Sequence, residues 1–196
     1  PGSAYPAVAS VFMTRDPDAV EAGDYEASLG YRAAVADEAG ADAFISIHNN
    51  TVPKGTRSSP GTQVFYSVGA PGSDRLATLL YDEVKAALSV FDVPWSGLSD
   101  AGARAYTDEE GADYFTVLSG TSPAVIVEGM YLSEPEEEAL LQTAEGRQAY
   151  AEGVYRGLLR YLTTDEWGTD PLPPGPWPGA SPGSPSNDSC VLPTIP

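Results

Sequence analysis

The sequence has very few cysteines and histidines, and it has no long apolar run. Its single cysteine, Cys190, has no partner for a disulfide within the chain, and a zinc site built from several cysteines is excluded. Because His48 is the only histidine, a metal site made by this chain alone would combine one imidazole with carboxylates. No apolar run approaches the roughly 20 residues that cross a bilayer, so we expect no membrane insertion. No signal peptide is recognisable.

Positive charge is also scarce. The 196 residues include 10 Lys and Arg against 28 Asp and Glu, which gives a net charge of -18. Such a surface is repelled by phosphate backbones, so we exclude nucleic acid as a partner. A hydrophobic content of 42% is sufficient for a core, and the length suits one domain with a tail.

Short apolar segments alternate with amphipathic stretches of helical period. This alternation predicts an α/β fold with a mostly parallel twisted sheet flanked by helices. The spacing of Ser133 and Glu136 is typical of a capping box at a helix start, and residues 92–110 are expected to form a loop. The expected strands are residues 8–14, 41–49, 62–67 and 124–127, and the expected helices are residues 25–39, 73–90, 133–142 and 145–162.

The composition changes after Trp167. Nine of the 18 prolines follow this residue, and no basic residue does. Proline removes the backbone donor that helices and central strands need. We therefore divide the chain into a main domain at residues 1–167 and a Pro-rich disordered tail or linker at residues 168–196.

Two expected strands carry a reactive side chain near their carboxyl ends, where open α/β sheets bind ligands. His48 lies near the end of one, and Glu128 directly follows another. Each alone has a simpler explanation, because a lone histidine is often structural and a buried acid is often ion-paired. The pair at equivalent strand ends favours a functional site, but periodicity alone does not identify its chemistry.

Several segments match, in order, the zinc-dependent N-acetylmuramoyl-L-alanine amidases of the type-3 amidase family. The segment VFMTRDPD resembles the family's V-x-x-T-R-x-x-D element, and an Arg-led helix from Arg32 precedes SIHNN, which resembles its S-I-H-x-N strand. GTQVFYS resembles its G-T-x-V-x-Y strand, and SPAVIVEGMYLSEPEE resembles its P-A-V-L-V-E-x-G-F-x-S-N-x-x-E segment. The resemblance covers residues 8–163, and Tyr131 and Glu134 stand where the family has Phe and Asn.

The resemblance implies hydrolysis of the amide bond between N-acetylmuramic acid and L-alanine in peptidoglycan. It implies zinc as the cofactor, His48 as a zinc ligand, and Glu128 as the catalytic group that moves the proton. Arg104 is a further candidate for positioning the substrate. The family's first histidine ligand and its glutamate ligand have no counterpart here. We therefore expect that the first strand and helix are missing at the N-terminus, and that this chain alone is inactive.

Other interpretations stay open from the sequence. One is a non-catalytic peptidoglycan-binding relative without a complete metal site, and another is an unrelated metallopeptidase on an α/β sheet. A generic acidic α/β domain would not have these motifs in this order. The resemblance further implies a bacterial protein, a monomer, that acts outside the cell or in the cell envelope. Substrate-binding residues remain unknown from the sequence.

Overall fold

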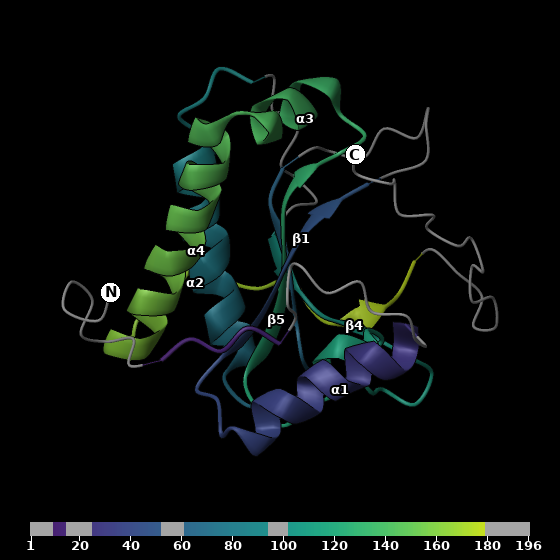
Figure 1. Ribbon diagram of the computed structural model, residues 1–196. Helices are drawn as coiled ribbons and strands as arrows, with labels where there is room; N and C mark the ends of the chain where they lie inside the picture. The colour runs from purple at the N-terminus through teal and green to yellow at the C-terminus, as the bar shows by residue number, and fades with distance from the viewer. Residues whose placement is uncertain (1–9, 15–24, 52–60, 94–101, 179–196) are drawn as a thin grey trace.

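The computed structural model describes residues 10–14, 25–51, 61–93 and 102–178. Within these ranges, helices and strands are interspersed along the chain, as in an α/β fold (Figure 1). The helices are α1 (Tyr25–Glu38), α2 (Ser73–Leu88), the 3-10 helix η2 (Thr116–Leu118), α3 (Pro135–Gln142) and α4 (Ala144–Thr163). The strands are β1 (Phe44–Asn50), β2 (Gln63–Tyr66), β3 (Gly102–Arg104), β4 (Tyr106–Thr107), β5 (Ala124–Tyr131) and β6 (Gly175–Pro176).

Four strands form the main sheet, in the order β1-β5-β2-β3. The pairs β1–β5 and β2–β3 are parallel, and β2–β5 is antiparallel, so the expected mostly parallel sheet is confirmed. A second sheet of two short parallel strands joins β4 to β6. β5 is central and longest, and seven of its eight residues are buried, which explains its nearly uncharged sequence.

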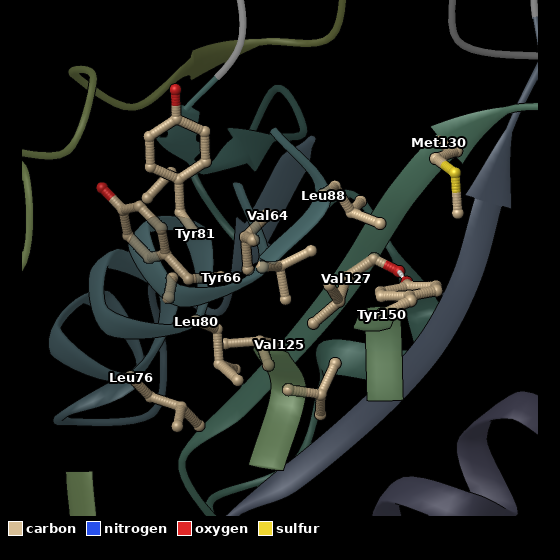
Figure 2. Packing of buried hydrophobic residues seen from close by; sticks show 14 of the residues in the cluster. Val64, Tyr66, Leu76, Leu80, Tyr81, Leu88, Val125, Val127, Met130 and Tyr150 are labelled. Atoms are coloured by element: carbon tan, nitrogen blue, oxygen red, sulfur yellow. Dashed lines mark hydrogen bonds between the residues drawn. The ribbon is translucent and has the colours of Figure 1, made fainter. Parts of the chain in front are cut away.

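Helices cover both faces of the sheet (Figure 1). On one face, α2 and α4 pack against alternate residues of the strands, including Val64, Val125 and Val127 (Figure 2). On the other face, Phe65, Ala124 and Ile126 form a second core with η2, to which Leu29 of α1 adds. Period-two alternation along β5 therefore distributes its side chains between two layers.

The expected strand at residues 8–14 is not formed where the structure describes it. Residues 10–13 have no secondary structure, and Val11, Phe12 and Met13 are 75%, 75% and 73% exposed. An apolar segment becomes a strand only when a neighbouring strand offers hydrogen bonds and a covered face, and no described strand pairs with this one. Residues 8 and 9 lie outside the described part.

Two other expectations need correction. The loop expected at residues 92–110 contains β3 and β4, whose two or three residues are too few to show a period. The capping box is also placed wrongly, because α3 begins after Glu134 rather than Ser133. It is the carboxylate of Glu137 that reaches back, accepting a hydrogen bond from the backbone N–H of Tyr131 at 2.8 Å.

The chain after α4 runs along the domain as far as residue 178, unlike the expected disordered tail. The backbone N–H groups of Thr169 and Leu172 donate to Asp82 and to the carbonyl of Ala103, and β6 pairs with β4. Trp177 stacks on Tyr114 with centroids 5.2 Å apart. An extended, proline-rich segment can still pair at a sheet edge, which explains this course. Residues 179–196 lie outside the described part.

None of the described helices combines the length and the apolar character that a membrane crossing requires.

Candidate active site

The sheet places His48 and Glu128 side by side. His48 of β1 is the register partner of Glu128 on the parallel neighbour β5, and Gln63 of β2 is the partner of Glu128 on its other side. Directly paired positions share a face of a sheet, so the three residues form a row across β1, β5 and β2. Glu128 lies two residues after Ile126, so the two side chains are on the same face of β5. This is the face on which Ile126 packs against η2 and α1.

A β-bulge follows the row. The register between β1 and β5 shifts between His48 and Asn50, because Asn50 pairs with Tyr131 rather than with a residue two positions after Glu128. Bulges bend a strand and re-aim its side chains, and they are common beside active sites. Here the bulge is centred on Gly129 and Met130 of β5, directly after Glu128.

The imidazole of His48 is held on its own strand. Its Nε2 lies 2.9 Å from the hydroxyl oxygen of Ser46, two residues earlier on the same face. Burial lowers the pKa of His48, and the positive charge of Arg32 on α1 acts in the same direction. Both effects favour the neutral ring, which is the form that binds a metal through a nitrogen lone pair.

Glu128 has the features of a proton-transfer group. Burial raises the pKa of its carboxyl to about 7, far above the ordinary value for glutamate. Its Oε2 is buried and has no hydrogen-bond partner among the described residues. A buried carboxylate oxygen without a partner is costly, which is explained if water, substrate or a cation normally faces it.

Gln63 is a member of the row that the sequence did not indicate. Its Oε1 accepts hydrogen bonds from Nδ2 of Asn50 at 3.0 Å and from the hydroxyl of Tyr131 at 3.1 Å. These contacts link β2 to β1 and to β5 at positions that follow the bulge. Only the register of β2 against β5 reveals this position, and no spacing within the sequence could have indicated it.

Arg104 is not brought next to His48 and Glu128. Arg104 belongs to β3 and is the register partner of Phe65 on β2, and Phe65 is in turn the partner of Ile126 on β5. Its Nη1 donates to the hydroxyl of Tyr106 at 2.9 Å. The structure therefore gathers His48 and Glu128 from the expected set and leaves Arg104 two strands away.

The described residues fit a zinc site only in part. His48 offers a neutral imidazole, and the unpartnered Oε2 of Glu128 faces the same side of the sheet. Catalytic zinc needs three protein ligands and an open position. In the described ranges, no three residues of the types His, Cys, Asp and Glu come together in a way that could hold a metal ion.

Most of the chain is similar to known proteins. A family model described as N-acetylmuramoyl-L-alanine amidase matches residues 5–160. The chain is 27% identical over 165 residues to a germination-specific N-acetylmuramoyl-L-alanine amidase of Bacillus subtilis, with 79% of this chain and 62% of that protein covered. It is 29% identical over 143 residues to an N-acetylmuramoyl-L-alanine amidase of Mycobacterium tuberculosis, with 68% of this chain and 53% of that protein covered. The chain thus spans 53% to 62% of the length of these two relatives.

Solved structures agree with this comparison. The catalytic domain of CwlV, an N-acetylmuramoyl-L-alanine amidase from Bacillus (Paenibacillus) polymyxa var. colistinus, superposes with a TM-score of 0.62 at 28% identity. That match covers 84% of this chain and 78% of the other. An N-acetylmuramoyl-L-alanine amidase from Clostridium difficile 630 gives a TM-score of 0.55 at 26% identity, covering 70% of this chain and 67% of the other.

Proposed function

Because the chain belongs to the N-acetylmuramoyl-L-alanine amidase family, we propose that it hydrolyses the amide bond between N-acetylmuramic acid and L-alanine in peptidoglycan. The observation that carries this proposal is the register pairing of His48 with Glu128. A neutral imidazole and a proton-accepting carboxylate on one face are the groups that metal-assisted amide hydrolysis requires.

Glu128 serves as general base and then general acid. It takes a proton from the attacking water as the water oxygen bonds to the amide carbon, and it returns that proton to the nitrogen of L-alanine as the C–N bond breaks. A pKa of about 7 suits both steps near neutral pH, since the group can accept and release the proton without a large energy difference.

His48 supplies one nitrogen ligand for zinc, and two further ligands are required from outside the described residues. Zinc, when bound, polarises the amide carbonyl and lowers the pKa of water. Ser46 fixes the orientation of the His48 ring through its contact with Nε2 in the metal-free chain. The protein acts as a monomer on peptidoglycan in the cell envelope or outside the cell.

The test compares zinc content and amide hydrolysis in four proteins. They are this chain, a version extended at its N-terminus to carry a further histidine and glutamate, and E128Q and E138Q in that version. Glu138 is an exposed glutamate of α3 and serves as the matched control. We expect the extended version and E138Q to bind about one zinc and to cleave, as the three-ligand site requires.

The E128Q variant is expected to retain zinc and to lose roughly 100- to 10,000-fold in rate, since it lacks the proton acceptor. Zinc binding and cleavage undiminished in E128Q would contradict the role of Glu128. Peptidoglycan binding without zinc or cleavage in the extended version would support a non-catalytic relative instead.

A further inference from the structure

Tyr150 of α4 contacts both strands that carry the proposed catalytic pair. Its hydroxyl oxygen lies 2.8 Å from the main-chain carbonyl oxygen of His48 and 2.9 Å from that of Val127, the residue before Glu128, so its single proton is shared between the two acceptors. Tyr150 is 6% exposed, so this contact lies in the interior of the domain. One hydroxyl therefore joins β1 and β5 at the level of the pair.

The β-bulge makes room for this contact. The ring of Tyr150 lies directly against Gly129, and any side chain at position 129 would overlap the ring. Figure 2 shows the Tyr150 ring next to Val127 on β5, among the residues packed on the α2 and α4 side of the sheet. The ring thus supports the bulge from the face opposite to the one that His48 and Glu128 occupy.

The hydroxyl remains a donor at every relevant pH. Burial raises the pKa of Tyr150 well above its ordinary value, and the negative charge of Glu128 acts in the same direction. The hydroxyl therefore keeps its proton near neutral pH and can act as a donor there. Loss of a buried donor leaves its acceptors without a partner, which is unfavourable when they stay buried.

We propose that Tyr150 is a positioning residue, whose hydroxyl fixes the backbones of His48 and Glu128 relative to each other across the bulge. This inference rests on the proposed function of that pair. A catalytic base and a metal ligand must be held within a fraction of an ångström of their working geometry. Bulged strands lack part of the regular ladder that would otherwise hold them.

Replacement by phenylalanine tests the proposal, because Y150F removes the hydroxyl and keeps the ring that fills the space against Gly129. The matched control is Y81F. Tyr81 belongs to the same core cluster, is 5% exposed, and accepts a hydrogen bond from Lys85 at 3.3 Å. It lies away from β1 in Figure 2, so its loss tests the general cost of deleting a buried hydroxyl.

The first measurement uses this chain without metal. Because His48 is its only histidine, nitrogen-15-labelled histidine gives one set of imidazole resonances, which report on this site alone. We expect Y150F to shift or split these resonances and Y81F to leave them in place. Unchanged resonances in Y150F would overturn the proposal, whether or not the chain is an amidase.

The second measurement uses the version that hydrolyses the amide, loaded with zinc. We expect Y150F to lower kcat by roughly 10- to 100-fold with KM nearly unchanged, since a displacement of about 1 Å can cost this much. We expect Y81F to keep the parent kcat. Equal kcat values for Y150F and Y81F would contradict positioning. Failure of the unmutated version to hydrolyse would instead contradict the proposed function, and the imidazole resonances would still decide the role of Tyr150.

Discussion

Burial of a carboxylate has two different uses in this protein, at Glu128 and at Glu137. Burial raises the pKa of both to about 7. Each carboxyl has one buried oxygen without a partner among the described residues, Oε2 of Glu128 and Oε1 of Glu137. The difference is that Glu128 lies beside His48 on the sheet, whereas Glu137 is 1% exposed and its other oxygen accepts from the backbone N–H of Tyr131 at the end of β5. Glu137 therefore ties α3 to the strand that carries the site, at a cost in stability when it is ionised.

The pH dependence of stability should reveal that cost. Because the pKa of Glu137 is higher in the folded state than its ordinary value of 4.5, the unfolded chain loses the proton first as pH rises. Stability therefore falls between about pH 4.5 and about pH 7. We expect E137Q to match the parent near pH 4 and to be more stable at pH 8, by on the order of 2 kcal/mol.

Urea unfolding at the two pH values measures this difference. The control is E138Q, which removes an exposed carboxylate from the same helix. If the difference in free energy of unfolding between the parent chain and E137Q is the same at pH 4 and pH 8, the raised pKa of Glu137 is contradicted.

His48 and Glu128 could be proposed as site residues from the sequence, because each lies at or after an apolar run that predicts a buried strand. Their pairing on one face needed the register, which no spacing within either segment contains. The roles of Gln63 and Tyr150 could not be predicted from the sequence for the same reason. Tyr150 fits the apolar stripe of its helix, and only the bulge at Gly129 shows where its hydroxyl points.

At the scale of elements, the close packing of α4 on α2 depends on glycine. A Cβ atom at Gly153 would lie 2.7 Å from the Cα of Val84, and one at Gly157 would lie 2.7 Å from the Cα of Leu80. The neighbouring atoms are backbone, which cannot move aside as a side-chain tip can. The two helix axes therefore approach more closely than larger residues would permit.

We expect G153A to lower the free energy of unfolding by about 1–3 kcal/mol, the usual cost of overpacking. The same change at Gly30 of α1 meets nothing within 4 Å, so G30A should be neutral or stabilising by up to about 1 kcal/mol. Urea unfolding of both variants checks the pair. Equal effects at the two positions would mean that helix propensity, rather than contact with α2, decides the outcome.

The helices α1, α2 and α4 were predicted within a few residues, because their length makes the period visible. The shorter α3 was predicted from a capping box rather than from a period. The strands were less certain. β5 extends to Tyr131 rather than ending at Val127, so Glu128 lies inside the strand, and β3 and β4 were missed. Short strands derive their pairing from neighbours distant in sequence, and that information is absent from a local pattern.

At the scale of the whole molecule, the segment after α4 packs back onto α2, β3 and β4. Arg75 of α2 donates to the carbonyls of Tyr161, Thr164 and Glu166, at 2.9, 3.2 and 3.3 Å. Along α2, the backbone N–H of Thr169 donates to Asp82, and that of Leu172 then donates to the carbonyl of Ala103 in β3. β6 pairs with β4, and Trp177 lies against the rings of Tyr106, Tyr114 and Phe115. These contacts continue past the family match, which ends at residue 160.

Truncation tests this boundary. We expect a chain ending at residue 178 to keep the melting temperature of the full chain, and a chain ending at residue 167 to melt at least about 5 °C lower, as a loss of a few kcal/mol implies. Scanning calorimetry of the three chains decides the matter. Equal melting temperatures for all three would show that residues 168–178 add nothing to stability.

The identity of the bond cleaved tests the central claim most directly. Purified peptidoglycan is digested with the zinc-loaded, N-terminally extended protein, and the new end groups are identified. The account predicts new α-amino groups that belong to L-alanine, no new reducing sugars, and no release by E128Q. New reducing ends, or new amino groups on any other residue, would contradict it.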